Sequence, residues 1–416
     1  MPADSLHGPA AGPTGVRLTT TLAAARTAAW LSRHVTGGTG RTIAGRTLLA
    51  LDPDAPDQLT AGRNVTLVSG TNGKTTTTAM LTAALRTRFT TASNADGANT
   101  PAGMVSALAA DRAGHAVLEV DEGWLPWAVE RLRPSRVVLL NLSRDQLHRH
   151  PEVHRLAAEW RHALRNVPLV VANADDPAVA WAAATARSLI WVGAGQDWLQ
   201  DSMSCPACGG LLTRTDGIWA CGCGCRRPTP VWSTTGGILR HHGQEIHLSL
   251  GVPGGVNLGN AALAVAAASA TGVEPDAAAR GTGTVHDIAG RYGRVRYRDQ
   301  QVRLLLAKNP AGWDAALQTV SPSSVPLVVV FNAEGVDGRD PSWLYDVDFG
   351  RLAGRPIAVT GRRGTDIFVR LRMAGLSPVG QFDTVAGALR ALPDGPVDLV
   401  ANYTAFQESR RALHAA

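Results

Sequence analysis

The chain has 416 residues, enough for two or three domains that each bury a hydrophobic core. Its 45% hydrophobic and 18% charged residues are typical of a globular protein, and no run of 18 or more apolar residues predicts a transmembrane helix. The net charge of +6 suits an anionic substrate such as a nucleotide, or equally reflects arginines spread over a solvated surface. There is no basic block of the kind that marks nucleic-acid-binding proteins.

The first 60 residues predict one or two helices that end in a turn-rich stretch, 51–64. Segment 19–35 (TTTLAAARTAAWLSRHV) has an arginine inside its apolar run, so it predicts an amphipathic helix and not a signal peptide. All five cysteines lie between residues 205 and 225, which argues against a disulfide framework. We therefore expect a cytoplasmic protein.

From residue 61 strand-like runs alternate with helical segments, as in a parallel α/β domain. The runs that predict strands are 65–70, 115–123, 136–143, 167–177 and 188–195. Ala- and Leu-rich segments at 76–89 and 152–164 predict helices between them. At about 198–240 cysteines, glycines and short β-like stretches replace this pattern and indicate a small insertion. Helical character returns at 257–272.

Beyond residue 296 the alternation predicts a second, smaller α/β domain. Its buried strands are expected at 302–307, 325–332, 356–361 and 397–404. The expected organisation is a helical segment 1–60, a larger α/β domain 61–294 that carries the insertion 198–240, and a C-terminal α/β domain 295–416.

The stretch VTLVSGTNGKTTTTAM predicts a phosphate-binding loop between a strand and a helix. Glycines let backbone N–H groups turn toward phosphate oxygens, and the helix N-terminus adds a positive dipole. Lys74 is expected at the outer phosphates and Thr75 at Mg²⁺. The general motif has a further glycine where this chain has Val68. The predicted ATP-binding residues of this loop are Gly70, Thr71, Asn72, Gly73, Lys74, Thr75 and Thr76.

The cysteines form a C-x-x-C pair, Cys205 and Cys208, followed after 12 residues by C-x-C-x-C. Two such pairs on tight turns can supply four thiolates to a tetrahedral Zn²⁺, and a redox-active pair is the alternative. Among Cys221, Cys223 and Cys225 we favour the first two as the remaining ligands. Four thiolates leave no open position, so the zinc is expected to be structural and to hold a ribbon too small for its own core.

These motifs resemble those of the Mur ligases and folylpolyglutamate synthases, which activate a carboxylate as an acyl phosphate before an amine attacks it. The resemblance implies ATP and Mg²⁺ as cofactors, with Glu119 of VLEVDEG as a Mg²⁺-binding acid. It places Asn257 and Asn260 at the adenine and Arg291 at a phosphate or the ribose. The ordinary alternatives are a strand-end acid for Glu119 and a helix cap for the asparagines.

A cysteine-rich insertion in such a domain resembles the MurT family, the synthetase subunits of the enzyme that amidates lipid II. Strings such as SNADGANTPAG, NLSRDQL and DGRDPSWLYDVDF agree, and the resemblance spans roughly residues 60–405. It implies ATP-dependent conversion of the α-carboxylate of D-glutamate in the lipid II stem peptide to D-isoglutamine. Ammonia would come from a GatD-like glutaminase partner in a heterodimer, and the lipid-linked substrate implies contact with the inner face of the plasma membrane.

Two other functions remain open from the sequence. The first is a ligase of the Mur or folylpolyglutamate type that adds an amino acid, and the second is a zinc-bearing scaffold that senses nucleotides without catalysis. Amide formation with ammonium or with an amino acid would separate the two ligases.

Two residues of the second domain complete the predicted catalytic set of Lys74, Glu119, Lys308 and Asp340. The resemblance implies that Asp340 orients the imidazolium of the partner's Cys–His pair, whereas Pro341 after it fits a plain helix start. Lys308 is one of only two lysines among 40 basic residues. It follows a predicted buried strand, and such strand ends face the ligand crevice in open α/β sheets. We expect Lys308 near the ATP phosphates or the acyl phosphate, the alternative being a lysine in solvent.

Overall fold

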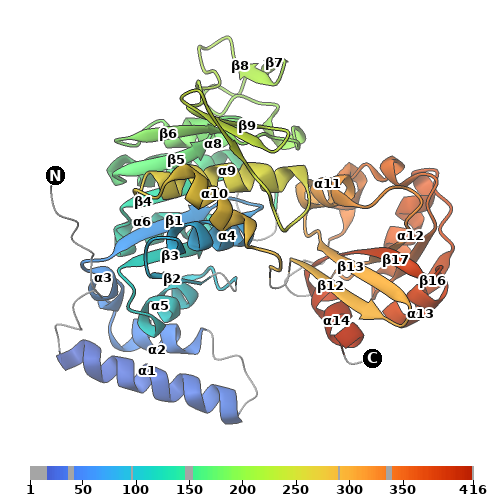
Figure 1. The fold of residues 1–416 in the computed structure, drawn as a ribbon, viewed down its shortest axis with the longest axis horizontal. Helices are drawn as coiled ribbons and strands as arrows, with labels where there is room; N and C mark the ends of the chain where they lie inside the picture. The colour runs from blue at the N-terminus through green and yellow to red at the C-terminus, as the bar shows by residue number, and fades with distance from the viewer. Residues whose placement is uncertain are drawn as a thin grey trace. The chain divides into compact units, whose positions relative to one another are not determined.

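The computed structural model describes residues 16–35, 42–94, 97–145, 153–288, 291–333 and 340–414 (Figure 1). They belong to two compact units. Unit 1 consists of 1–142, 152–251 and 256–286, and unit 2 of 143–151, 252–255 and 287–416. Each unit contains its own sheet and its own apolar core.

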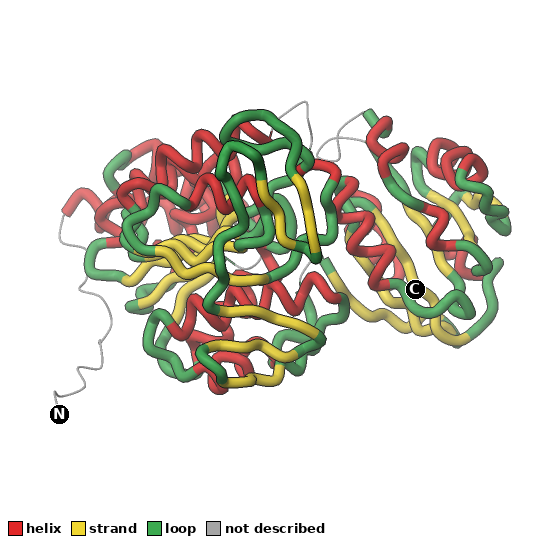
Figure 2. The backbone as a smooth tube through the Cα atoms, turned by 90° about the horizontal axis from the view of Figure 1, so that it is seen from above, coloured by secondary structure: helices red, strands yellow, loops and turns green. Residues whose placement is uncertain are grey.

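Unit 1 is built on a nine-stranded sheet in the order β11-β10-β9-β6-β5-β4-β1-β3-β2. The mutually parallel strands are β1 (Asn64–Ser69), β2 (Thr91–Ser93), β3 (His115–Val120), β4 (Arg136–Leu139), β5 (Leu169–Asn173) and β6 (Leu189–Gly193). Strand β9 (Trp232–Thr235) runs parallel to β6, and β10 (Ile238–His241) and β11 (Gln244–His247) follow it antiparallel. Helices lie on both sides of this sheet (Figure 2). The central strands are therefore apolar along most of their length, which is typical of parallel sheets.

The helices of unit 1 alternate with its strands. They are α1 (Val16–Val35), α2 (Ile43–Leu51), α3 (Ala55–Thr60), α4 (Lys74–Arg86), α5 (Pro101–Ala110), α6 (Leu125–Leu132), α7 (Val153–Ala163), α8 (Pro177–Ala183), α9 (Gly255–Ser269) and α10 (Pro275–Gly283), with short 3-10 turns η1 (Glu122–Trp124), η2 (Leu164–Asn166) and η3 (Gln200–Ser202). Helix α3 lies in the stretch 51–64 predicted to be rich in turns. It carries Pro56 in its first turn, where a missing N–H costs nothing.

The cysteine-rich insertion adds a two-stranded sheet of β7 (Thr213–Thr215) and β8 (Ile218–Ala220), drawn at the top of Figure 1. Its buried Trp219 packs in a small cluster with Ala180, Cys205 and Leu212. The indole Nε1 of Trp219 donates to the carbonyl of Ala174 at 3.0 Å, so the insertion is hydrogen-bonded to the loop that follows β5.

Unit 2 contains a six-stranded sheet in the order β12-β13-β17-β14-β15-β16, in which only β12 is antiparallel. Its strands are β12 (Tyr292–Tyr297), β13 (Gln300–Leu306), β14 (Leu327–Val330), β15 (Ile357–Thr360), β16 (Gly380–Phe382) and β17 (Gly395–Ala401). Its helices are α11 (Pro310–Thr319), α12 (Gly364–Met373), α13 (Val385–Arg390) and α14 (Tyr403–His414), with 3-10 turns η5 (Ser342–Asp346) and η6 (Phe349–Leu352). The predicted fold class, an α/β protein with a second α/β sheet and a four-cysteine insertion, is thus confirmed.

None of the helices in the described ranges is both long enough and apolar enough to cross a bilayer.

Candidate functional site

The predicted phosphate loop joins β1 to α4, and two of its glycines occupy positions without room for a side chain. Gly73 precedes α4 with φ 85°, and a Cβ there would lie 2.6 Å from Oδ1 of Asn260. A Cβ on Gly70 would lie 2.8 Å from Cβ of Leu140. The loop therefore packs directly against α9 on one side and the end of β4 on the other.

Asn141, which follows β4, holds the loop backbone in place. Its carbonyl accepts the N–H of Thr71 at 2.9 Å, and its side chain forms two hydrogen bonds with the backbone of Asn72, each 3.0 Å long. The sequence did not single out this residue. The available signal was a polar residue directly after a buried strand that the parallel topology could place beside β1.

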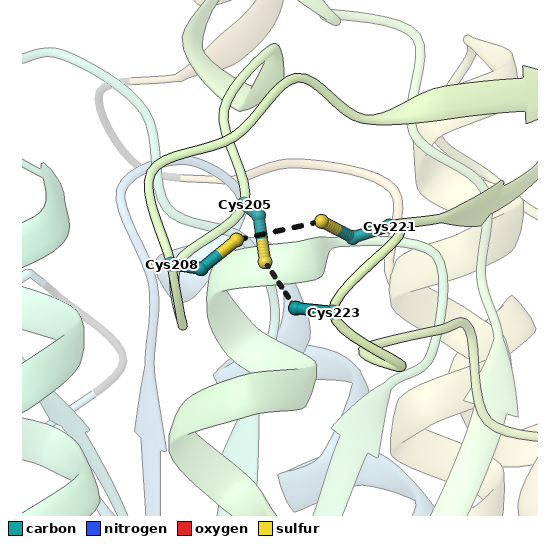
Figure 3. A group of neighbouring side chains, drawn as sticks. All are labelled: Cys205, Cys208, Cys221 and Cys223. Carbon is teal, nitrogen blue, oxygen red and sulfur yellow. Dashed lines mark hydrogen bonds between the residues drawn. The ribbon is translucent and has the colours of Figure 1, made fainter.

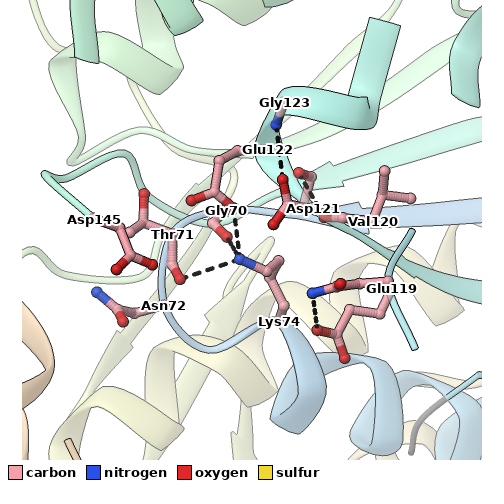
Figure 4. A network of polar contacts seen from close by, with 12 residues as sticks. Gly70, Thr71, Asn72, Lys74, Glu119, Val120, Asp121, Glu122, Gly123 and Asp145 are labelled. Carbon is pink, nitrogen blue, oxygen red and sulfur yellow. Dashed lines mark hydrogen bonds and ion pairs between the residues drawn. The ribbon is translucent and has the colours of Figure 1, made fainter. Parts of the chain in front are cut away.

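Lys74, the first residue of α4, is buried within the loop and makes three polar contacts (Figure 4). Its Nζ donates to the carbonyls of Gly70 and Thr71, at 2.5 and 3.2 Å, and to Oε2 of Glu122 at 2.7 Å. Burial by itself lowers the pKa of Lys74, but the nearby carboxylates, Glu122 foremost, outweigh it and raise the pKa above its usual value. The ammonium is therefore charged, and its ion-pair partner Glu122 was missed by the sequence analysis.

Glu119 lies at the end of β3 and is fully buried. Its backbone N–H donates to Oδ1 of Asn94 at 2.7 Å, and its Oε1 accepts from Asn99 at 3.1 Å. Within the described part of the chain, its Oε2 and the Oγ1 of Thr75 are buried without a hydrogen-bond partner. Carboxylate and hydroxyl oxygens are the donors that a Mg²⁺ ion takes, so these two residues fit the predicted metal.

The two predicted adenine-side asparagines lie together near the start of α9. Nδ2 of Asn260 donates to Oδ1 of Asn257 at 3.1 Å, and Asn260 is the residue that faces Gly73. Unit 1 thus gathers the loop from Gly70 to Thr76, Glu119 and the asparagines in one region. Arg291, Lys308 and Asp340 belong to unit 2.

Within unit 2, Lys308 follows β13 and forms an ion pair with Asp145, which the sequence analysis did not anticipate. The Lys308 side chain is 18% exposed and that of Asp145 is 6% exposed, so the pair is largely buried. The next residue, Asn309, caps α11 by accepting the N–H of Gly312 at 2.7 Å. A role for Lys308 at the phosphates stays a prediction.

Asp340 is exposed and lies two residues before η5. Its carboxylate accepts hydrogen bonds from the N–H and the hydroxyl of Ser342, at 2.9 and 3.0 Å. These bonds lower the pKa of Asp340, so the carboxylate is charged at neutral pH. The carbonyl of Arg291, just before β12, accepts the N–H of Leu306 at 3.0 Å. The functional roles of Asp340 and Arg291 also stay predictions.

The thiols of Cys205, Cys208, Cys221 and Cys223 point toward one another, and all four Sγ atoms lie within 4.8 Å of each other (Figure 3). The Cys205–Cys223 and Cys208–Cys221 pairs are 3.7 and 3.5 Å apart. A tetrahedral zinc with Zn–S bonds of about 2.3 Å requires sulfurs about 3.8 Å apart, so the cluster fits this metal. Cys225 is outside the group.

The thiols of the cluster shift one another's pKa in opposite directions. The N–H of Gly210 lowers the pKa of Cys208, but hydrogen bonds with the neighbouring thiols outweigh this and raise that pKa to about 12. Burial opposes loss of the Cys205 proton, but the N–H groups of Ala207 and Cys208 and the neighbouring thiols lower the pKa of Cys205 to about 7. A thiolate is the form that binds a metal.

Two protein-family models match the chain. The Mur ligase middle domain matches residues 68–202, and the MurT ligase C-terminal model matches residues 306–406. The MurT subunit of lipid II isoglutaminyl synthase (glutamine-hydrolyzing) from Streptococcus pneumoniae is 28% identical, covering 90% of this chain and 93% of that protein. Its counterpart from Staphylococcus aureus (strain N315) is also 28% identical, over 86% and 88%. UDP-N-acetylmuramate–L-alanine ligase of Kineococcus radiotolerans is 31% identical, over 81% and 68%.

Solved structures share the fold at low sequence identity. A pseudomurein peptide ligase type C from Methanothermus fervidus has a TM-score of 0.66 at 20% identity, covering 89% of this chain and 84% of its own. Folylpolyglutamate synthase of Mycobacterium tuberculosis, complexed with ADP, has a TM-score of 0.62 at 16% identity, covering 95% and 98%. The fold, the two family models and the full-length relatives agree: the chain belongs to the MurT family of the Mur ligases, which are ATP-dependent ligases.

Proposed function

We propose that the chain is the synthetase subunit of a lipid II isoglutaminyl synthase. It would amidate the α-carboxylate of D-glutamate in the lipid II stem peptide and so produce D-isoglutamine. The observation that carries this proposal is the MurT C-terminal match over residues 306–406 in a chain whose Mur-type unit holds a four-cysteine group. The match to this chain covers nearly the whole length of the two MurT relatives, which supports extending their named activity to this chain.

The proposed reaction has two steps. An oxygen of the carboxylate attacks the γ-phosphorus of ATP, and ADP leaves, which gives an acyl phosphate. Ammonia then attacks the acyl carbon, and phosphate departs with the former carboxylate oxygen, so that a C–N bond replaces a C–O bond. Catalysis in such a transfer is largely positioning and charge stabilisation.

The residues of unit 1 supply these two effects. The backbone of the loop Gly70 to Thr76 cradles the phosphates, and the charged Lys74 neutralises the transferring phosphoryl group. Thr75 and Glu119 would hold Mg²⁺, which would supply further neutralisation of the phosphate charge. Asn257 and Asn260 would bind the adenine side of the nucleotide. The resemblance to the Mur ligases also assigns Arg291, a residue of unit 2, to a phosphate or the ribose.

The ammonia would come from a GatD-like glutaminase, with which this chain would form a heterodimer. All five cysteines of this chain lie in or beside the cluster at 205–225, which leaves none elsewhere as an amidotransferase nucleophile. Asp340, charged and exposed, is suited to orient a histidine of the partner. Zinc at the four cysteines would be structural, and the lipid-linked substrate would bring the complex to the inner face of the membrane.

The test is a reconstituted reaction with lipid II, ATP, a GatD-like glutaminase and glutamine labelled with ¹⁵N at the amide. We expect lipid II that carries one ¹⁵N amide, with ADP and phosphate formed in equal amounts, and no product from Lys74→Ala. If lipid II instead gains an amino acid supplied in the mixture, the chain is a ligase of the Mur or folylpolyglutamate type.

A further inference from the structure

Glu122 is a buried carboxylate that the proposed reaction does not use, and it lies directly on the lysine of the phosphate loop. It is 2% exposed and follows β3 by two residues, at the first position of η1. Its Oε2 lies 2.7 Å from Nζ of Lys74, which is 4% exposed. A buried ion pair of this kind is costly to form, because both charges lose their hydration, and it is weak evidence for a role in stability alone.

The ammonium of Lys74 has no donor left over in this arrangement. An ammonium carries three N–H groups, and Lys74 uses them on the carbonyls of Gly70 and Thr71 and on Glu122. A phosphate oxygen can therefore bind this ammonium only by exchange with one of the three acceptors or by sharing its hydrogen. Two of them belong to the loop backbone, so the Glu122 side chain is the acceptor that can move by rotating about its own bonds.

Two hydrogen bonds hold the backbone around Glu122 in place. The buried indole of Trp160 donates from Nε1 to the Glu122 carbonyl at 2.9 Å. On the preceding residue, the Asp121 side chain accepts the N–H of Gly123 at 3.2 Å and so closes the turn. The carboxylate thus stays attached to a rigid turn, within reach of the ammonium.

We propose that Glu122 is a positioning residue that competes with the nucleotide's outer phosphate for Lys74 and thereby weakens ADP binding and speeds ADP release. The carboxylate of Glu122 is hydrogen-bonded to Nζ of Lys74. It must move away from Nζ, or share the ammonium, when a phosphate binds. This inference rests on the part of the proposed function in which a nucleotide binds at the loop. It does not depend on which acceptor the ligase uses.

The size of the effect follows from the geometry. A carboxylate 2.7 Å from Nζ and a phosphate oxygen about as far on its other side would be roughly 5.5 Å apart. Repulsion between unit charges at this distance, with an effective dielectric constant of about 20, corresponds to about a hundredfold in affinity. Movement of the carboxylate and neutralisation by Mg²⁺ reduce this upper limit, so we expect about tenfold.

The experiment measures ADP binding in the presence of MgCl₂ by calorimetry, and ADP release by stopped flow with a fluorescent ADP analogue. Glu122→Gln keeps the shape of the side chain and one acceptor oxygen but removes the charge, and it should bind ADP about tenfold more tightly and release it correspondingly more slowly. Glu122→Asp keeps the charge and should stay within about threefold of the unaltered protein. Asp121→Asn is the matched control, because it removes a neighbouring charge that has no hydrogen bond to Lys74 in Figure 4.

Unchanged or weaker ADP binding by Glu122→Gln overturns the proposal, and so does equal tightening by Glu122→Asp. Glu122→Met is a second neutral variant. If it and Glu122→Gln both melt far below the unaltered protein and bind no ADP, the carboxylate is needed for folding and the proposal also fails. Absence of ADP binding by the unaltered protein would instead contradict the proposed function, whereas failure to amidate lipid II would leave the ADP comparison intact.

Discussion

Replacement of Gly73 by alanine tests the packing of the phosphate loop, and Gly62 provides a matched control. Both glycines have positive φ, 85° and 71°. A Cβ on Gly62 meets nothing within 4 Å, whereas one on Gly73 would lie 2.6 Å from Oδ1 of Asn260. The two substitutions therefore share the backbone strain and differ in the steric clash.

The expected magnitudes separate the two contributions. An L-residue in the left-handed region costs about 1–2 kcal/mol, so Gly62→Ala should lower the free energy of unfolding by that amount. Gly73→Ala adds the cost of overpacking, about 1–3 kcal/mol, because Asn260 is buried and hydrogen-bonded to Asn257. Displacement of the loop away from Asn260 should also tilt the first N–H groups of α4 away from the phosphates. We expect ADP affinity to fall at least tenfold for Gly73→Ala and to stay unchanged for Gly62→Ala.

Urea unfolding and ADP calorimetry on both variants provide the assay. Equal stability of the two variants within about 0.5 kcal/mol, together with ADP binding by Gly73→Ala like that of the unaltered protein, would contradict this prediction, because the loop would then be free to move away from α9.

Three further predictions concern the stability of the two units and the retention of zinc. Asp176 is fully buried at the start of α8, and desolvation raises its pKa to about 6. Because this pKa exceeds that of the unfolded chain, the contribution of Asp176 to stability increases as the pH falls from 7 to 5. Urea unfolding at each pH should show an increase of about 1 kcal/mol relative to Asp176→Asn. An equal difference at both pH values would contradict this. Asp398→Ala breaks the bidentate pair with the largely buried Arg303 and should destabilise unit 2 by about 3 kcal/mol. Asp366→Ala, which breaks an exposed pair, should cost less than about 1 kcal/mol in the same unfolding assay. Similar losses in the two variants would contradict this difference between buried and exposed pairs. Cys208→Ser should abolish zinc retention after dialysis, measured by elemental analysis, while Cys225→Ser, outside the four-sulfur group, should retain it; loss in both would assign the fifth thiol to the site.

Local sequence patterns predicted much of the fold because strands, turns and helices of this chain have distinct residue compositions. Apolar runs such as 65–70 become buried parallel strands, and the glycine-rich turn before Lys74 leads directly into α4. The four-cysteine group could be predicted because thiol spacing on tight turns restricts the geometry. The antiparallel strand β12 was not predicted, since its alternating arginines give a weak strand signal at an exposed edge.

The contacts of the two lysines could not be predicted from the sequence. Three acids lie close together in the sequence, Glu119 within β3 and Asp121 and Glu122 directly after it, and only the turn of η1 decides which one pairs with Lys74. Lys308 and Asp145 are 163 residues apart, and no local periodicity relates them. The scarcity of lysine drew attention to both positions, but the acidic partner of each depends on tertiary structure.

The most direct test of the proposed chemistry follows the oxygen that leaves the carboxylate. Lipid II labelled with ¹⁸O in the α-carboxylate of its D-glutamate is converted by this chain with ATP and ammonium, and the inorganic phosphate is analysed by mass spectrometry. Activation as an acyl phosphate predicts one ¹⁸O in phosphate for each amide formed. Amide formed with unlabelled phosphate, or label in AMP, would contradict it.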